Sequence, residues 1–177
     1  VEQARTKPTG IKLGPGHPHE AIPDDAEAQW LSIDGDLVEL ALWFGEVKRP
    51  KVARAATVVN STGRHEIVSE TFESEPAEVS QLKQFIFEPD NAIVRSHLIA
   101  DLANEVGATL ISREIAYLTS DEQIDSPMMR DADPLLGLAV AQAAVEEALD
   151  QRGQPLVDRF GSCRGGGRRR GGSLVLA

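Results

Sequence analysis

The segment from Phe85 to Asp121 constrains the fold most, because it contains the start and stop signals of a complete structural unit. It opens with the β-prone block Phe85–Phe87. Asp90 follows, and its side chain can cap a helix by accepting hydrogen bonds from the first unpaired amides. Apolar residues then recur at approximately helical spacing, at Ile93, Val94, Leu98, Leu102 and Val106. The first half of the segment therefore predicts a strand followed by one capped helix.

The second half of the segment predicts the end of that helix and two more strands. Gly107 stands where a left-handed C-terminal cap is expected. The runs Ala108–Ile111 and Ile115–Leu118 resume strand-like composition. Thr119, Ser120 and Asp121 are turn-forming residues and are expected to end the last strand.

The residues before this segment predict two hairpins and a short first strand. Asp34-Gly35 favours the positive backbone angles of a tight turn, and Ser61-Thr62-Gly63 is the second turn candidate. The expected strands are Ile11–Leu13, Ala28–Ile33, Leu37–Phe44, Ala53–Val59 and His65–Glu70. With the later segment, the residues from Ala53 onward give the order β-β-β-α-β-β.

Composition argues against a generally basic surface for binding nucleic acid, because the 177 residues have a formal charge of −10. The charge is uneven. Residues 151–177 hold six arginines and one acid, which leaves 18 − 6 = 12 bases and 28 − 1 = 27 acids in the first 150. The single cysteine, Cys163, can form no internal disulfide, and no Cys/His grouping indicates zinc. No apolar run approaches the length of a membrane span, so a cytoplasmic location without a membrane partner is expected.

Several short motifs resemble one known family. The motifs FEPD, GATLIS and IAYLTSD, followed by Ser126-Pro127, are similar to the THUMP-like domain at the C-terminus of a family of bacterial class I S-adenosylmethionine-dependent methyltransferases. The resemblance spans Ile11 to Pro127. KLGPG resembles the fifth strand of the methyltransferase sheet with its carboxyl-end loop. AEAQWLSIDGDLVELALWFG resembles the sixth and seventh strands, the last of them antiparallel.

The resemblance implies an α/β fold with an α+β module, in which the last strands of a class I methyltransferase sheet precede a small THUMP-like domain. Gly45 to Lys51 is the expected linker. The implied parts are residues 1–45 from the methyltransferase sheet, 46–130 as the THUMP-like domain, 131–152 as a helix of uncertain status and 153–177 as a disordered Arg/Gly-rich tail.

In such enzymes S-adenosylmethionine lies over the first strands, on a glycine-rich turn. No strand in this sequence leads into such a turn and a helix, so this chain alone is not expected to bind the cofactor. The resemblance implies the C-terminal part of an RNA-directed methyltransferase that is inactive alone. Its candidate partners are RNA and a separately encoded N-terminal methyltransferase half. The alternatives are a stand-alone RNA-binding or scaffold module and a non-functional truncated product.

The turn from Gly14 to Glu20 is the best local candidate for a site, because loops at the carboxyl ends of parallel strands face ligands. Lys12, Pro15, Gly16 and His17 are the expected substrate-facing residues, with an ordinary surface loop as the alternative. His17, His19 and Glu20 lack a convincing further ligand, so no metal is expected. Decorating a helix surface is the simpler role for Arg95 and His97, and Arg95 is also a candidate phosphate contact. No catalytic residue is identified.

Three other features have simpler interpretations. Trp30 and Trp43 are expected to serve burial. The acidic loop Glu70–Glu78 is expected to form a solvated face. After Pro127 the sequence leaves the family pattern, and Leu135–Gln151 predicts a helix. A one-nucleotide frameshift near Met128 to Asp133 is one hypothesis for this departure, because the shifted reading can restore a strand, a basic helix and a further strand.

Overall fold

The computed structural model describes residues 7–72, 76–113, 115–133 and 139. The elements below all lie in one compact unit, Val1–Ala144. A second unit, Val145–Ala177, contains no described residue. The helix expected at Leu135–Gln151, apart from Ala139, and the tail expected at residues 153–177 therefore lie outside the described residues.

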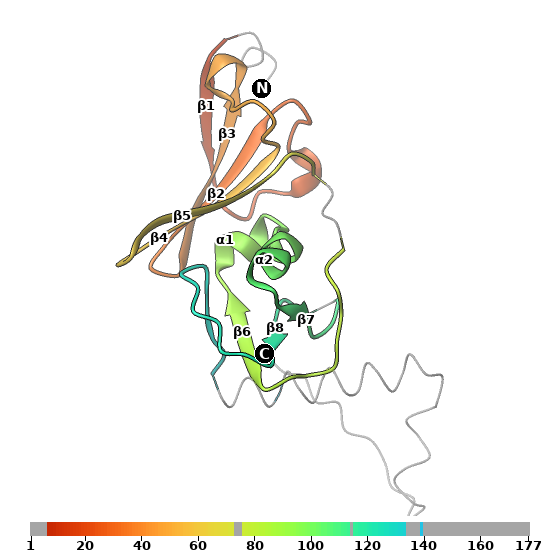
Figure 1. The fold of residues 1–177 in the computed structure, drawn as a ribbon. Coiled ribbons are helices and arrows are strands. Elements are labelled where there is room, and N and C mark those ends of the chain that lie inside the picture. The colour runs from red at the N-terminus through yellow and green to blue at the C-terminus, as the bar shows by residue number, and fades with distance from the viewer. Residues whose placement is uncertain (1–6, 73–75, 114, 134–138, 140–177) are drawn as a thin grey trace, which may run out of the picture. The chain divides into compact units, whose positions relative to one another are not determined.

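The first half of the described chain forms a five-stranded sheet with the strand order β1-β3-β2-β4-β5 (Figure 1). β3 is antiparallel to both β1 and β2, as the resemblance to the closing strands of a methyltransferase sheet implied. β4 is parallel to β2, and β5 is antiparallel to β4. The strands are β1 (Thr9–Leu13), β2 (Glu27–Ile33), β3 (Asp36–Phe44), β4 (Arg54–Asn60) and β5 (Gly63–Ser69).

Both predicted hairpins are present. Asp34 and Gly35 have φ angles of 51° and 87°, which is the double positive angle that a two-residue type I′ turn requires. In the second turn, the Asn60 side chain accepts a hydrogen bond from the Thr62 amide. The β4–β5 hairpin adds to the sheet that holds β1 to β3. The predicted boundary at Glu46 falls at η3 (Gly45–Val47), between two strands of one sheet, and the division into domains stays a prediction.

The second half forms a smaller four-stranded sheet with the order β7-β8-β6-β9. Its strands are β6 (Phe85–Pro89), β7 (Thr109–Leu110), β8 (Leu118–Ser120) and β9 (Met129–Asp131). The strand predicted at Ile115–Leu118 begins only at Leu118, because the Tyr117 amide closes a turn onto the Ile115 carbonyl at 2.8 Å. As predicted, Ser120 ends the strand, and its hydroxyl accepts a hydrogen bond from the Glu122 amide at 3.1 Å. Thr119 has a different role. Thr119 is fully buried in β8, and its hydroxyl donates to the Phe85 carbonyl.

The single helix predicted after Asp90 is in fact two helices, α1 (Asn91–Arg95) and α2 (Ile99–Val106). Asp90 caps α1 as predicted, accepting from the Ala92 amide at 2.8 Å. The break follows from His97, whose φ of 60° is left-handed. The amides of His97 and Leu98 bond back to Val94 and Ile93, which is the Schellman pattern that usually has glycine at the left-handed position. The apolar spacing of Ile93 and Leu98 does not reveal this break. Gly107 ends α2 with a φ of 72°, as predicted.

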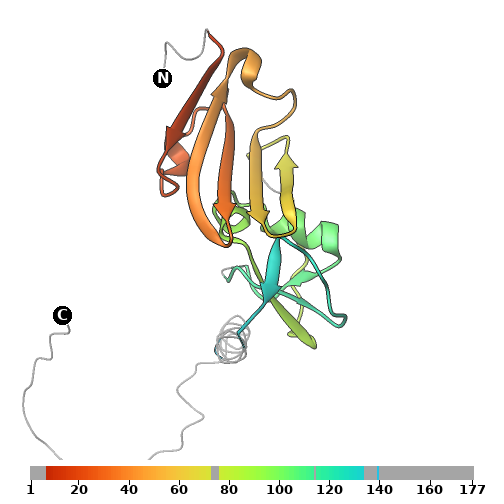
Figure 2. The same ribbon diagram turned by 90° about the vertical axis from the view of Figure 1, so that its left-hand side faces the viewer.

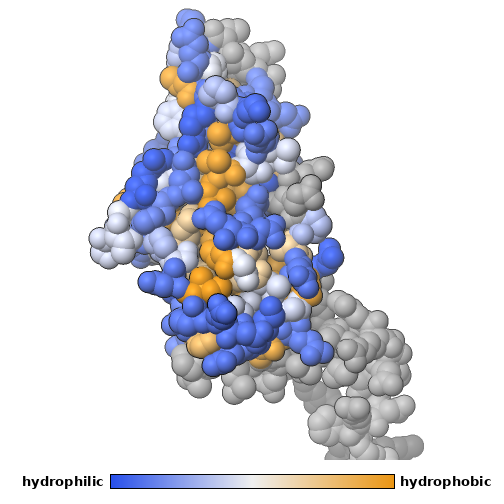
Figure 3. Space-filling view, in the orientation of Figure 1, coloured by the Kyte–Doolittle hydropathy of each residue, from blue (hydrophilic) through white to orange (hydrophobic). Residues whose placement is uncertain are grey.

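One apolar core joins both sheets and the two helices. Its fully buried members come from every layer and include Trp30, Leu40, Ala56, Phe87, Ile93, Leu98, Leu102 and Leu118. α1 contacts β2, β3 and β4, while α2 contacts β5 and β7. The helices therefore cover the inner face of the five-stranded sheet. Figure 2 shows its five strands side by side, and on the face drawn in Figure 3 the apolar residues form a narrow band between hydrophilic ones.

β9 continues the fold beyond the point where the family pattern was expected to end. Met128 and Met129 are buried in the core, and β9 pairs with β6. The Ala132 amide still donates to the Ile86 carbonyl at 3.0 Å. The sequence as read is thus integrated into the fold through Ala132, and the frameshift stays a hypothesis. None of the helices among the described residues is long and apolar enough to cross a membrane.

Candidate functional site

The loop that follows β1 is a compact turn rather than an open strand end. The His17 amide donates to the Gly14 carbonyl at 3.1 Å, so Gly14 to His17 form a β-turn with Pro15 at its second position. A single turn of 3-10 helix, η2 (His19–Ala21), comes directly after it. The amides of Ala21 and Ile22 donate to the carbonyls of Pro18 and His19. The loop from Gly14 to Glu20 therefore has its own hydrogen-bonded framework.

Arg95, at the end of α1, holds this loop from the other half of the described chain. Its Nε donates to the Pro15 carbonyl at 3.1 Å, and its Nη2 donates to the His17 carbonyl at 2.9 Å. The structure thus brings together three of the predicted site residues, Pro15, His17 and Arg95, although 78 or more positions separate Arg95 from the loop. The loop atoms that accept from Arg95 are backbone oxygens, so this contact does not depend on which side chains the loop carries.

A column of three aromatic rings lies beside these hydrogen bonds. The His19 ring stacks on His97 with 4.0 Å between ring centroids, and on Trp30 with 5.1 Å between ring centroids. The interplanar angles are 9° and 17°. Trp30 is fully buried in the core, His19 is half-buried and His97 is exposed. The column therefore runs from the core of the sheet to the surface through the loop.

Burial and neighbouring charges favour the neutral forms of the two histidines of the column by lowering their pKa values. Burial lowers the pKa of His19, and the nearby charges of His97, Arg95 and Arg54 lower it further, against a smaller opposing effect of a backbone hydrogen bond. Burial also lowers the pKa of His97, helped by Arg54 and Arg95. The buried Nε2 of His19 has no hydrogen-bond partner among the described residues. A protonated ring at that place would lack the acceptor that an imidazolium needs, which agrees with the direction of the shift.

A second arginine, Arg54 of β4, supports the break between the helices. It is 1% exposed, and its Nη1 donates to the carbonyls of Ser96 and His97 at 3.0 and 3.2 Å. Its Nε donates to the Thr71 carbonyl. Burial lowers the pKa of Arg54, partly offset by Asp101. Sequence reasoning missed this residue, because nothing in a β-strand pattern marks one arginine as a ligand of distant carbonyls.

The remaining predicted site residues lie differently. Gly16 is exposed in the turn, where a Cβ would meet no heavy atom within 4 Å. Lys12 is 72% exposed and pairs with Glu39 at 2.5 Å. Its register partner is Ala41, so Lys12 belongs to the outer face of the sheet and is not brought to the aromatic column. Among the described residues, no three His, Cys, Asp or Glu side chains are grouped to hold a metal ion.

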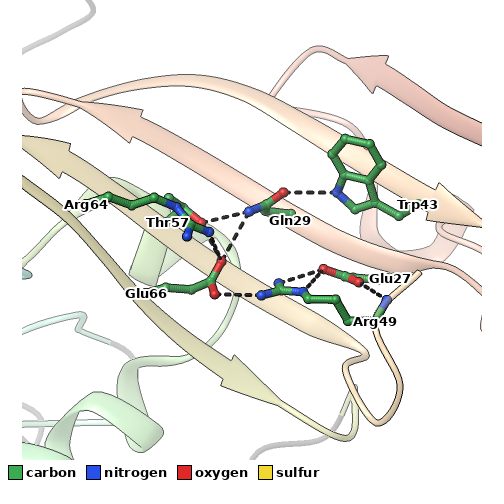
Figure 4. A network of polar contacts seen from close by, with 7 residues as sticks. All are labelled: Glu27, Gln29, Trp43, Arg49, Thr57, Arg64 and Glu66. Carbon is green, nitrogen blue, oxygen red and sulfur yellow. Dashed lines mark hydrogen bonds and ion pairs between the residues drawn. The ribbon is translucent and has the colours of Figure 1, made fainter. Parts of the chain in front are cut away.

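Charged residues with lowered or raised pKa values also gather on the outer face of the five-stranded sheet (Figure 4). Trp43 donates to Gln29, which donates in turn to Thr57 and Glu66. Arg49 joins the network by pairing with Glu66 and with Glu27, at 2.6 Å each. Every strand of the sheet except β1 contributes a side chain, and Arg49 comes from the segment after η3.

The pKa values in this network move in the directions that stabilise ion pairs. Burial disfavours the charge of Arg49, yet hydrogen bonds and charges of Glu27 and Glu66 raise its pKa on balance. Burial likewise opposes ionisation of Glu66, but Arg49, Thr57 and Arg64 together lower its pKa. The side chains in Figure 4 bind one another, and the buried Nη2 of Arg49 lies in an ion pair with Glu27 but has no hydrogen-bond partner, so the network fits a structural role better than a catalytic one.

One cavity of about 270 Å³ lies where the β2–β3 turn meets β6 and β9. Its lining includes the carboxylates of Asp34, Glu88 and Asp90 together with Arg130. Arg130 is already bound to Glu88 through two hydrogen bonds, and Asp90 accepts from Ser32 and Ala92. None of the predicted site residues lines this cavity.

Comparison with known proteins supports the fold alone. No family model matches the sequence, and no curated protein matches it. The structure is similar to the crystal structure of a putative methyltransferase from Porphyromonas gingivalis W83, with a TM-score of 0.50 and 16% sequence identity. The match covers 70% of this chain and 34% of that chain, so this chain corresponds to about a third of the other protein. The mixed α/β architecture is therefore shared with a protein described as a methyltransferase.

Proposed function

We propose that this chain is the C-terminal part of an S-adenosylmethionine-dependent methyltransferase that acts on RNA in the cytoplasm, with residues 46–130 as its THUMP-like domain. The carrying observation is the strand order β1-β3-β2 with an antiparallel β3, followed at the carboxyl end of β1 by a loop that the second half of the chain holds in place. Loops at that edge of an α/β sheet are where ligands bind. RNA as the substrate comes from the family resemblance.

The described residues do not fit the cofactor itself. β1 and β3 lead into 3-10 helices, while β2 and β4 lead into hairpin turns. β6 leads into α1, but through Pro89 and Asp90 rather than through a glycine-rich turn. A nucleoside cofactor in a doubly wound sheet needs such a turn and an acidic residue for its ribose. We therefore assign no chemical step to this chain and place cofactor binding in a separately encoded N-terminal half.

The outer edge of β1 is the proposed contact with that half. Among the described residues no strand pairs with this edge, so the backbone groups of Thr9–Leu13 that point away from β3 lack strand partners there. Ile11 and Leu13 pack against the core, which fixes the orientation of the edge. An added strand would satisfy the backbone groups and extend the sheet, which is a common mode of association between chains.

Calorimetric titration with S-adenosylmethionine tests the cofactor assignment. The chain alone is expected to bind none, whereas a mixture with the polypeptide encoded immediately upstream is expected to bind it. Saturable binding by the chain alone would overturn the assignment, as would an upstream polypeptide that binds the cofactor but does not associate with this chain.

Transfer of a labelled methyl group tests the substrate class. We expect the reconstituted pair to label total RNA and not total protein. Label in protein alone would contradict the RNA assignment while leaving the methyltransferase assignment intact. RNA binding by this chain alone, falling steeply with salt concentration, would instead favour a stand-alone RNA-binding module.

A further inference from the structure

The junction between α1 and α2 contacts the loop Gly14–Glu20 through two side chains, Arg95 and His97. Arg95 binds the Pro15 and His17 carbonyls, and the His97 ring stacks on His19. The loop is thus held at three of its residues by two side chains that lie two positions apart. Trp30 supports the same loop from the core by stacking on His19.

The junction is itself held in an uncommon conformation. His97 occupies a left-handed position that glycine adopts without steric cost, whereas other residues there carry strain of roughly 1 kcal/mol. Arg54, on the β4 strand of the five-stranded sheet, stabilises this conformation by donating hydrogen bonds to the Ser96 and His97 carbonyls. In a continuous helix through residues 96–98, those carbonyls would accept from amides of the helix itself, and the His97 ring would point in another direction. The break therefore determines where the His97 ring points.

We infer that the Arg95–His97 junction positions the loop Gly14–Glu20 for its ligand, with Arg95 acting on the ligand through the backbone of the loop. This inference rests on the proposed function in one respect, namely that the loop faces the substrate. Arg95 is then a positioning residue. A planar guanidinium suits this role, because it directs two donors at two carbonyls at once, which a lysine ammonium on a flexible stem does less well.

The inference gives the second half of the chain a defined task. Arg54 of β4 orders the junction, and the junction orders the loop at the carboxyl end of β1. Because coupling between binding events is reciprocal, a ligand that binds the ordered loop must also stabilise the junction. The segment after β5 would thus act on substrate binding without touching the substrate.

Amide hydrogen exchange of the full 177-residue chain, read by NMR, tests the positioning role. The amides of His17, Ala21 and Ile22 report on the loop, because each donates a hydrogen bond within it. In Arg95→Lys these three amides are expected to exchange about tenfold faster or more, since charge-assisted hydrogen bonds to the loop are lost. Ala56 and Val58 in the middle of the sheet should keep their protection. Arg64→Lys is the matched control, because it makes the same substitution in an exposed ion pair with Glu66.

His97→Asn is the second variant, because asparagine tolerates left-handed backbone angles but has no aromatic ring to stack. It is expected to speed exchange in the loop while leaving β4 unchanged. Unchanged loop protection in both variants would overturn the inference. A uniform loss of protection in the loop and in β4 would also overturn it, since that result means that Arg95 and His97 contribute only to global stability.

Fluorescence gives a readout that general stability does not move. In a Trp43→Phe background Trp30 is the only tryptophan of the chain, and it stacks on His19. Its emission should titrate with His19, with a midpoint below 6.5. Removing the ring in His97→Asn should move the midpoint upward, because His97 buries His19 and adds a repulsive charge. An unchanged midpoint would contradict the coupling. Both measurements use no RNA and no cofactor, so the failure of the proposed function would leave them unaffected.

Discussion

The two faces of the five-stranded sheet are covered in different ways, and the two tryptophans show the difference. Trp30 lies on the inner face, fully buried on the strand that α1 contacts, and it stacks on His19. Trp43 lies on the outer face, half-buried, with its indole N–H donating to Gln29 at 3.0 Å. The inner face is covered by helices and apolar side chains. Among the described residues no helix covers the outer face, which is instead covered by its own long polar side chains.

The outer face shows that a sheet can bury small residues without a layer of helices over them. Ala55 and Thr57 are almost completely buried there, beneath a network that runs from Trp43 through Gln29 to Glu66 and Arg49. Thr57 is itself a member of this network, and the hydrogen bonds between its long polar side chains let them shield this face from water. We therefore expect the inner face to contribute to the free energy of unfolding mainly through apolar packing. We expect the outer face to contribute mainly through its hydrogen bonds and ion pairs.

The largest effect is expected on the inner face, in Trp30→Ala. Removing this buried side chain leaves a cavity in the core and should lower the free energy of unfolding by about 3–5 kcal/mol. Trp43→Ala should cost less, about 1–2 kcal/mol, because the ring is half-exposed and loses one hydrogen bond. Urea denaturation of both variants measures the difference. Equal decreases in the free energy of unfolding in the two variants would contradict the proposed difference between the two faces.

The next effect concerns the completeness of the outer network. Glu27 is 1% exposed and pairs with Arg49. Arg49→Met should lower the free energy of unfolding by about 2–3 kcal/mol, since it leaves a buried carboxylate without its cation. Adding Glu27→Gln should recover part of that loss, because the amide needs no counter-charge. If the double variant is as unstable as the sum of the single variants, the two side chains are not coupled.

Most of the local structure could be predicted from the sequence, because turn and cap signals act over a few residues. Asp34-Gly35, Asp90 and Gly107 each take the predicted role. The helix break at His97 could not be predicted in this way. It depends on Arg54, which lies 42 or more positions away and binds the carbonyls of the break. Apolar spacing continues through the break, so periodicity alone favours one helix.

The candidate site could be predicted only in part, for the same reason. The loop after β1 and Arg95 were each marked by their sequence context, but their contact joins residues from the two halves of the described chain. The pairing of His19 with His97 has no local signal at all. Their ring contact becomes visible only once the sheet and the helix junction are placed together.

A smaller effect is expected where the outer face meets the edge strand. A Cβ on Gly10 would lie 2.7 Å from Cζ3 and 3.0 Å from Cε3 of Trp43, which is closer than side chains pack. Gly10→Ala should therefore displace the indole and lower the free energy of unfolding by about 1 kcal/mol. Gly14→Ala is the control, because nothing lies within 4 Å of its Cβ position. Equal stability of the two variants would mean that Trp43 does not need its place over Gly10.

The smallest effect separates the two faces by pH. On the inner face, the pKa values of His19 and His97 are lowered from 6.5, by burial and by Arg54 and Arg95. The unfolded chain then binds more protons than the folded chain as the pH falls from 6.5 toward the lowered values, so stability decreases in that window. On the outer face, the pKa of Glu66 is lowered from 4.5, and the stability that its ion pairs provide decreases only below that pH.

Urea midpoints measured from pH 7.5 to pH 3 should therefore decrease in two separate windows. His97→Asn should flatten the upper window and leave the lower one, because it removes one of the two imidazoles that resist protonation. Glu66→Gln should flatten the lower window and leave the upper one. A single substitution that flattens the pH dependence of the urea midpoint in both windows would show that the two faces titrate as one unit. The proposed difference between a face stabilised by packing and a face stabilised by polar contacts would then be wrong.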